Sequence, residues 1–475
     1  MPIINHHGHK KSLRIILRKL FVVCSSLNEV RTRVLALRGL RPRPLVDEAK
    51  ISTQRILPRE EFLCKPYNLR NSFRGGKLFM KPVVIGTAGA GYAARLHGNG
   101  YKAVTGIPFK LKTVCDLNME LAEGVRRDFG YESITADYDS MLADPEINVI
   151  DIVTPPFLHV PMAVRALKAG KSVICEKPLT GYFGKKGEEN IGHVTSRNVM
   201  YESVMSSMNE LRDVLRETGG RFMYAENFVY ALPVQKAAEI IRAKRSKILF
   251  MKGEESLKGS SSPVAGKWNR TGGGCLIRTG THPLSGMLWL KHQEAKARGE
   301  DIGISSVTAD TGTTTATLNE YEHRHISARP EDVEDYAAVT VTFTDGTKCL
   351  TIASDTVLGG TKNYIEVYAN DTALTCNITP TDILNTYFLD EEGLEDVYIS
   401  EMLPSKLGWN KAFVSDEIIR GYSGELKDFL EAVAYDREAE SGFEIAYETV
   451  QVIYAAYLSA SEGRRVDINS QNSAM

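Results

Sequence analysis

Short apolar runs alternate with amphipathic stretches in the first half of the chain. Each run is rich in β-branched residues and too short for a helix, which is typical of strands buried on both faces. The stretches between the runs repeat their apolar residues at helical spacing. Strands are predicted at 81–85, 109–115, 149–153, 172–175 and 221–228, and the polar stretch 181–218 is predicted to be helical. Strands that alternate with helices in this way predict an α/β fold with a doubly wound, parallel sheet.

The pattern changes after residue 230, where apolar and polar residues alternate within short segments. A period of two is typical of strands with one buried and one exposed face. Strands are predicted at 247–254, 304–310, 336–343, 348–354 and 364–368, and helices at 424–435 and 445–460. The turn sequence Thr344-Asp-Gly-Thr joins two of these strands as a hairpin. The second half is therefore predicted to be an α+β domain with an open sheet.

The composition is that of a globular protein of the cell interior. Hydrophobic residues make up 43% of the chain and charged residues 25%, close to the average for soluble proteins. No apolar run approaches the roughly 18 residues of a membrane span. Seven cysteines are dispersed without a CxxC pair, which predicts reduced thiols and a cytoplasmic location. No residue cluster has metal-ligand spacing, so no metal is predicted.

Charge divides the chain into two unlike parts. Residues 1–79 contain 17 basic and 5 acidic residues, whereas the remaining 396 contain 41 basic and 54 acidic. An acidic body argues against nucleic acid as the main partner, because phosphate binding needs a basic surface. The basic leader has three open interpretations: an organelle transit peptide, a tail for an acidic partner, or sequence upstream of a start at Met80.

A glycine-rich turn follows the first predicted strand. Gly89, Gly91 and Ala94 form a GxGxxA motif that also contains Tyr92 and Ala93. Gly89 permits the tight turn, Gly91 lets the backbone approach a pyrophosphate, and Ala94 lets a helix pack on the strand. The helix that begins there supplies free N–H groups to phosphates. A glycine turn without a ligand is the alternative for the motif taken alone.

An acidic residue ends the second predicted strand. Asp116 lies 25 residues after Gly91, where a carboxylate can accept both ribose hydroxyls of NAD and would repel a 2′-phosphate. Its neighbours Leu117 and Asn118 include no arginine, so NAD is predicted over NADP. The alternative makes Asp116 the N-cap of a helix over 119–129.

Polar residues also follow the third and fourth predicted strands. Thr154 and Pro155, with His159 shortly after them, follow one strand, and Glu176 and Lys177 follow the next. Ligands of doubly wound sheets bind at the carboxyl ends of the strands. These residues are therefore predicted to line the cofactor cleft.

These runs resemble a known family. The sequences GTAGAGYAARLH and TPPFLHVPMAVRALKAGKSVICEKPL are similar to the Gfo/Idh/MocA family of nicotinamide-dependent oxidoreductases. The resemblance covers residues 81 to about 468. It implies that Lys177 approaches the nicotinamide and the substrate hydroxyl, that Glu176, Thr154 and His159 line the cleft, and that Asn227 and Tyr230 contact substrate. A strand-end turn is the alternative for Asn227.

The resemblance also implies an organisation. We expect an NAD-binding domain at 80–230 and a substrate-binding and oligomerisation domain at 231–475, with a mostly antiparallel sheet and with helices 424–460 able to pack back on the first domain. The family's sheet often builds the subunit interface, which implies a homodimer, homotetramer or higher oligomer.

One segment departs from the family pattern. A glycine run leads into Arg278 and His282, whereas the family has an aspartate four residues before the histidine. The resemblance makes His282 catalytic, and a structural histidine is the alternative. Arg278 cannot be a general base. It could favour a neutral base by charge repulsion, bind a substrate carboxylate or hydroxyl pair, or be a surface residue. We expect both side chains on one helical face, pointing toward the cleft.

The sequence thus predicts an NAD-dependent dehydrogenase that oxidises a secondary hydroxyl of a sugar, cyclitol or glycoside, including the glycoside 3-hydroxyl. Lys177 and His282 are the predicted catalytic residues. Two alternatives stay open: a glycosidase that uses NAD for transient oxidation, and a non-catalytic NAD-binding regulator. Retention of both residues argues against the regulator.

Overall fold

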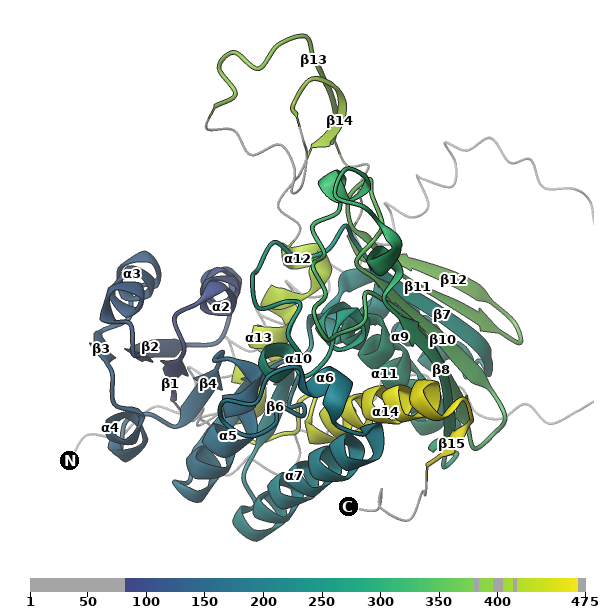
Figure 1. Ribbon diagram of the computed structural model, residues 1–475. Helices are drawn as coiled ribbons and strands as arrows, with labels where there is room; N and C mark the ends of the chain where they lie inside the picture. Colours follow the sequence, from purple (N-terminus) through teal and green to yellow (C-terminus); the bar gives the residue numbers. More distant parts are fainter. Residues whose placement is uncertain (1–81, 380–383, 396–404, 413–416, 469–475) are drawn as a thin grey trace, which may run out of the picture. The chain divides into compact units, whose positions relative to one another are not determined.

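The computed structural model describes residues 82–379, 384–395, 405–412 and 417–468 (Figure 1). The basic leader, residues 1–79, lies outside the described residues, so the structure does not bear on its three interpretations. Two large sheets organise the described part, one of six strands and one of seven. A separate two-stranded sheet is formed by β13 (Leu384–Phe388) and β14 (Gly408–Ala412).

The first sheet confirms the predicted doubly wound architecture. Its strand order is β3-β2-β1-β4-β5-β6, and every neighbouring pair is parallel. The strand order reverses between β1 and β4, which is where such sheets bind ligands. The strands are β1 (Val83–Ala88), β2 (Phe109–Cys115), β3 (Ser133–Thr135), β4 (Val149–Ile152), β5 (Ser172–Glu176) and β6 (Phe222–Ala225).

Helices cover both faces of this sheet. Figure 1 shows α2 and α3 on one face and α4, α5 and α7 on the other. Their bounds are α2 (Tyr92–Ala103), α3 (Met119–Phe129), α4 (Tyr138–Ala143), α5 (His159–Lys168) and α7 (Arg197–Thr218), with short turns at η2 (Pro156–Leu158) and α6 (Ile191–Val194). The predicted helical stretch 181–218 is therefore helical mainly in its second part. There, Met200, Val204 and Met208 recur at helical spacing and are buried.

The strand predicted at 221–228 is shorter than expected. It ends at Ala225, and α8 (Asn227–Tyr230) begins directly after it. Glu226 is the N-cap of α8, because its side chain accepts a hydrogen bond from the Phe228 N–H. An acidic residue at this position stabilises a helix start, so the chain turns away from the sheet one residue after the strand.

The second sheet is mixed and mostly antiparallel. Its order is β12-β11-β7-β10-β9-β8-β15, and the parallel neighbours in it are β7 and β10. The turn at Thr344–Thr347 joins β9 and β10 as predicted. The strands are β7 (Ile248–Ser256), β8 (Ile304–Gly312), β9 (Tyr336–Phe343), β10 (Lys348–Ser354), β11 (Lys362–Ala369), β12 (Ala373–Asn377) and β15 (Val466–Asp467).

Three helices pack on one face of this sheet, α9 (Leu232–Lys244), α11 (Thr281–Arg298) and α14 (Phe443–Glu462) (Figure 1). Alternate residues of β9, including Val339, Val341 and Phe343, are buried beneath them. Shorter elements are α10 (Trp268–Thr271), η3 (Leu276–Gly280), η4 (Thr314–Thr317), η5 (Glu322–His325) and α12 (Glu417–Arg420).

The C-terminal helices connect the two sheets. Helix α13 (Tyr422–Ala434) packs on α2, and α14 packs on α7. At Gly100 of α2 an added Cβ would lie 2.6 Å from the Leu426 side chain of α13, so the two helices approach closely. Among the described residues, no helix has the length and apolar character needed to cross a membrane.

Candidate active site

The glycine loop leaves open space at the carboxyl end of β1. Gly89 has φ +106°, and a Cβ there would lie 2.7 Å from the Val153 carbonyl oxygen. At Gly91 a Cβ would meet nothing within 4 Å, and no side chain caps the start of α2. Within α2, Ala94 is buried, whereas Tyr92 is 78% exposed. An open backbone surface at an uncapped helix start fits the phosphates of a dinucleotide.

Asp116 connects the end of β2 to this loop. Its Oδ2 accepts a hydrogen bond from the Ala90 N–H over 2.7 Å, and its Oδ1 accepts one from the Asn118 N–H over 2.8 Å. The alternative that made Asp116 the N-cap of α3 is wrong, because Asn118 accepts the N–H groups of Glu120 and Leu121. Asp116 therefore lies beside the glycine loop.

His159 is a structural brace. Its ring is buried, with Nε2 2.7 Å from the Thr154 carbonyl oxygen and Nδ1 2.9 Å from the Pro178 carbonyl oxygen. Burial lowers the pKa of His159, although both carbonyls oppose that shift. Both nitrogens lie within hydrogen-bond distance of backbone carbonyls, so His159 holds together the loops after β4 and β5. Its contact with the cofactor stays a prediction. Thr154 is partly buried and Pro155 is exposed beside it.

A buried polar network lies behind the cleft. His97 of α2 places Nδ1 3.0 Å from both carboxylate oxygens of Asp151 in β4, and Tyr101 donates a hydrogen bond to Asp151 over 2.9 Å. The Nε2 of His97 lies 3.3 Å from Oε1 of Glu176. These four side chains form a chain from the core to the end of β5.

Electrostatics in this network favour a charged histidine. Burial alone would lower the pKa of His97, but Asp151 and Glu176 raise it well above its ordinary value. Burial opposes ionisation of Glu176, yet His97 lowers its pKa. The sequence prediction did not include His97 or Asp151. An aspartate inside an otherwise apolar strand was the signal that could have found them.

Lys177 lies next to this network. Its backbone N–H donates to Glu176 Oε2 over 2.8 Å, and its Nζ donates to the Arg278 carbonyl oxygen over 3.1 Å. The side chain is partly exposed. The hydrogen bond from Nζ thus directs the Lys177 ammonium group toward the backbone of Arg278.

Arg278 does not share its surroundings with His282. The segment Leu276–Gly280 is a π-helical turn, so the i,i+4 geometry of an α-helix that we expected does not hold there. The Arg278 guanidinium forms an ion pair with Asp355, just after β10, and their side chains are 17% and 5% exposed. His282, in the first turn of α11, contacts other elements.

His282 is paired with a glutamate that the sequence analysis missed. Its Nδ1 lies 2.7 Å from Glu226 Oε1, and its ring stacks on Phe228 with centroids 4.9 Å apart. Glu226 is fully buried. A carboxylate on one ring nitrogen fixes the tautomer and leaves the other nitrogen for chemistry. An acidic residue directly after the last parallel strand was the available signal.

Two predicted substrate contacts are occupied by the protein itself. Asn227 donates from Nδ2 to the Arg420 carbonyl oxygen over 2.9 Å. The Tyr230 hydroxyl donates to Asp428 over 2.8 Å and accepts from the Ser441 N–H over 2.9 Å. Both side chains are buried. Contact of Asn227 and Tyr230 with substrate stays a prediction.

Comparison with known proteins identifies the family. The description "Oxidoreductase family, NAD-binding Rossmann fold" matches residues 82–200, and its "C-terminal alpha/beta domain" matches residues 247–468. The chain belongs to the Gfo/Idh/MocA family. The predicted family is thus confirmed, and the chain is an oxidoreductase with an NAD-binding Rossmann domain.

Relatives within the Gfo/Idh/MocA family act on sugars. Levoglucosan dehydrogenase of Pseudarthrobacter phenanthrenivorans is 26% identical over 428 residues, which cover 82% of this chain and 99% of the relative. D-glucoside 3-dehydrogenase of Escherichia coli is 24% identical over 213 residues, covering 44% of this chain and 54% of the relative. Both of these relatives are named as dehydrogenases of carbohydrates.

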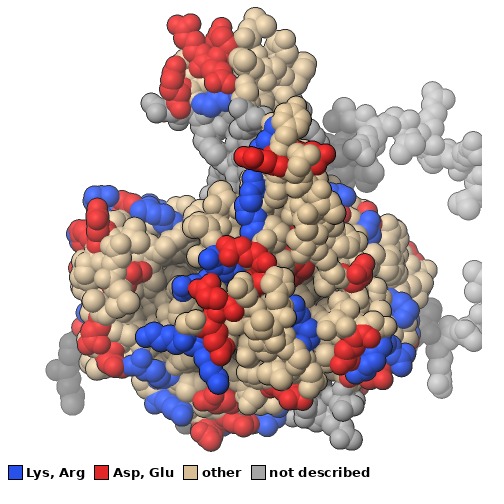
Figure 2. Space-filling view, viewed as in Figure 1, with Lys and Arg blue, Asp and Glu red and all other residues tan. Residues whose placement is uncertain are grey.

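A solved structure has the same fold as this chain. A crystal structure of GenD2 from gentamicin A biosynthesis, in complex with NAD, superposes with a TM-score of 0.65 at 23% identity and covers 84% of this chain and 99% of the other. Among the described residues, no group of three or more His, Cys, Asp or Glu side chains is placed to hold a metal ion. Figure 2 shows acidic and basic side chains intermixed over most of the face in view.

Proposed function

We propose that this protein is an NAD-dependent dehydrogenase that oxidises a secondary hydroxyl of a sugar, cyclitol or glycoside. The observation that supports this function is the meeting of Lys177 and the His282–Glu226 pair near one buried carboxylate. Glu176 is close enough to both Lys177 and His282 that their charges help to lower its pKa. A cationic donor and an oriented histidine at the carboxyl ends of parallel strands suit proton removal from an alcohol.

In this mechanism His282 is the general base. Because Nδ1 is held by Glu226, Nε2 is free to accept the proton of the substrate hydroxyl. The Lys177 ammonium group donates a hydrogen bond to the same oxygen and stabilises the negative charge that develops on it. Hydride acceptance from the carbinol carbon is the chemistry that the bound cofactor would supply.

The cofactor is proposed to be NAD. Gly89, Gly91, Tyr92 and Ala93 would hold its phosphates at the start of α2, and Thr154 and Pro155 would border it. Asp116 would accept ribose hydroxyls with the lone pairs that Ala90 and Asn118 leave free. The names of the relatives support a carbohydrate substrate, and one of them supports the glycoside 3-hydroxyl as the reacting group.

We also propose the division into an NAD-binding domain at 80–230 and a second domain at 231–475, because β6 ends before and α9 begins after that boundary. The five cysteines within the described residues are free and buried, which supports the proposed cytoplasmic location. Homo-oligomerisation through the second sheet stays a prediction.

The test is NADH formation with levoglucosan, methyl β-D-glucoside and myo-inositol as substrates. Lys177→Ala and His282→Ala should each reduce turnover roughly 10²–10⁴-fold while NAD binding persists. Lys186→Ala, at an exposed lysine nearby, is the matched control and should be unaffected. Normal turnover of His282→Ala would remove the histidine from the mechanism, and cleavage of the glucoside without NADH accumulation would indicate a glycosidase instead.

A further inference from the structure

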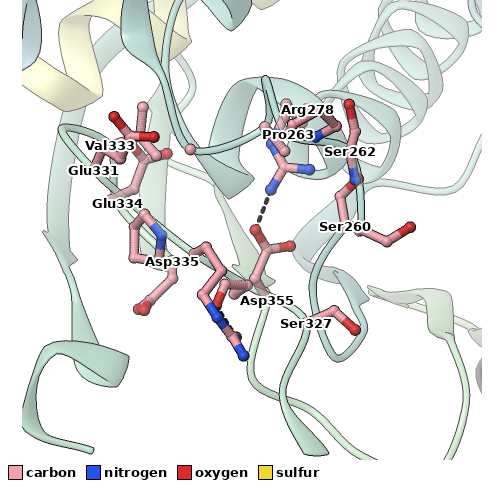
Figure 3. Close-up of a pocket in the computed structure, with 16 residues that line it drawn as sticks. Ser260, Ser262, Pro263, Arg278, Ser327, Glu331, Val333, Glu334, Asp335 and Asp355 are labelled. Carbon is pink, nitrogen blue, oxygen red and sulfur yellow. Dashed lines mark hydrogen bonds and ion pairs between the residues drawn. The ribbon is translucent and has the colours of Figure 1, made fainter. Parts of the chain in front are cut away.

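A cavity of about 290 Å³ lies between two loops of the second sheet (Figure 3). One loop, residues 257–267, follows β7, and the other, residues 326–335, precedes β9. The loops are joined through their backbones, since the Ser327 N–H donates to the Lys258 carbonyl oxygen over 2.7 Å. Four serines belong to the lining: Ser260, Ser261, Ser262 and Ser327.

Two buried carboxylates of this cavity are saturated by the protein. Each oxygen of Asp335 accepts hydrogen bonds from the backbone N–H and hydroxyl of a threonine, Thr314 for one and Thr315 for the other. Glu334 accepts two N–H groups from residues 274 and 276 and the Tyr457 hydroxyl. These two carboxylates hold the loops and have a structural role.

Asp355 differs from them. Its side chain is 5% exposed, and one oxygen pairs with Arg278. Within the described part of the chain its Oδ1 has no hydrogen-bond partner, and neither has Nε of Arg278. Figure 3 shows the two side chains meeting at the cavity, with Ser260 and Ser262 close to Arg278. A buried carboxylate oxygen without a donor is unfavourable, so this oxygen is suited to a donor from a ligand.

Arg278 connects the cavity to Lys177, which is not itself part of the cavity lining. The carbonyl oxygen of Arg278 accepts the hydrogen bond of Lys177 Nζ over 3.1 Å, while its guanidinium lines the cavity. A ligand with its reacting carbon near Lys177 could therefore extend along Arg278.

We propose that this cavity binds two adjacent hydroxyl groups of a polyol substrate, with Asp355 accepting a hydrogen bond from one and Arg278 donating to the other. This assignment rests on the proposed dehydrogenase function. An anionic ligand would meet the carboxylates of Glu331, Glu334, Asp335 and Asp355, and an apolar ligand would leave Oδ1 of Asp355 without a donor. The volume lies just below the range of small-molecule sites, about 300–1,000 Å³, and suits the hydroxyl-bearing end of a sugar or cyclitol.

Asp355→Asn tests the assignment, because it removes the charged acceptor with little change of shape. The ligand is whichever of levoglucosan, methyl β-D-glucoside and myo-inositol binds most tightly. Its affinity and KM are compared with those of its monodeoxy analogues, with affinity measured by calorimetric titration of the enzyme–NADH complex. The wild type should bind the parent about 10–100-fold more tightly than the analogue that lacks the hydroxyl held by Asp355. Asp355→Asn should lose this preference, whereas Glu331→Gln, at an exposed carboxylate of the same cavity, should keep it.

The assignment would be overturned if Asp355→Asn weakened binding of the parent and the analogues equally, or if it left the preference unchanged. Asp355 and Arg278 would then form only a structural ion pair. If Asp355→Asn does not fold, Arg278→Lys carries the test, because it keeps the charge but loses the planar donors. Calorimetry separates the two proposals. Absence of NADH formation with every polyol would reject the dehydrogenase function, whereas selective polyol binding would still support the cavity.

Discussion

At the residue scale, each reactive side chain of the proposed site is oriented by a partner. His282 is held by Glu226, the Lys177 ammonium group by the carbonyl of Arg278, and Asp116 by the Ala90 N–H. Such partners fix the tautomer or the direction of a group at little entropic cost during the reaction. Substitutions of the partners should therefore affect turnover as substitutions of the reactive groups do.

We expect Glu226→Ala to slow turnover nearly as much as His282→Ala, within roughly 10²–10⁴-fold, because His282 loses the acceptor at Nδ1. Glu226→Gln keeps an acceptor oxygen and should retain more activity. The measurement is a double-mutant cycle in kcat. If the two residues act as one unit, the double alanine variant should be no slower than His282→Ala. Losses that multiply would show that the residues act independently.

The second residue-scale prediction concerns Asp116. Exchange of Asp116 for serine together with arginine at Leu117, whose side chain is 90% exposed, should raise the kcat/KM for NADP relative to NAD. The carboxylate that repels a 2′-phosphate is removed and a cation that can bind it is added. Preference of the wild type for NADP would contradict the ribose assignment.

At the scale of elements, the π-helical turn η3 determines where Arg278 points. The turn is tied to the loop before β9, since Glu334 accepts the N–H groups of Gly274 and Leu276. An α-helical continuation would have set Arg278 and His282 on one face. The wider turn separates them, so that one residue lies at the cavity and the other beside Glu226.

We expect Gly274→Ala to destabilise the protein by about 1–3 kcal/mol. An added Cβ would lie 1.8 Å from the Glu334 carbonyl oxygen, and backbone must shift to relieve the contact. Gly91→Ala is the matched control, since its Cβ would meet nothing within 4 Å. It should leave the urea midpoint unchanged but raise the KM for NAD. A stable Gly274→Ala variant would show that η3 can adjust.

At the scale of the whole molecule, ionisable groups of the first sheet and of the C-terminal helices meet where α2 and α13 pack. Glu425 of α13 is buried, and its Oε2 has no partner among the described residues. Burial raises the pKa of Glu425 well above its ordinary value; His97 opposes this shift, and the carboxylates of Glu176, Glu226 and Asp151 add to it. The contact between the helices therefore takes up protons on folding.

Stability should consequently fall as pH rises. For His97 the folded pKa is raised, so its contribution is complete below about pH 6.5 and is lost as pH rises through the folded value. For Glu425 the raised pKa lowers stability at every pH above the ordinary pKa of glutamate, because the carboxyl ionises in the unfolded chain before it ionises in the folded protein. We expect Glu425→Gln to be more stable than the wild type at pH 8, by roughly 1–3 kcal/mol, and similar to it near pH 4.5.

Urea unfolding at several pH values between 4.5 and 9.5 measures this dependence. His97→Gln should lose most stability at acidic pH and progressively less at higher pH. Glu462→Gln, at an exposed glutamate, serves as the control and should follow the wild type. A Glu425→Gln variant with the pH profile of the wild type would show that Glu425 is ionised in the folded protein.

The sequence by itself determined the fold class, the order of most strands and helices, and the glycine loop. Apolar spacing and turn residues act over a few neighbouring positions, and β2 and α3 have the bounds predicted from them. The short strands β3, β12 and β15 escaped prediction, because segments of 2 to 5 residues carry too little periodicity.

Only the tertiary structure decided which polar groups meet. His282 and Glu226 are 56 positions apart, and Arg278 and Asp355 are 77 apart. The two ring nitrogens of His159 face backbone carbonyls of Thr154 and Pro178. A side chain's partner depends on how distant elements pack, and a π-helical turn can redirect it without a clear change in local pattern. Residue type thus indicated what chemistry was available, while packing determined which groups hold one another and which are left for a ligand.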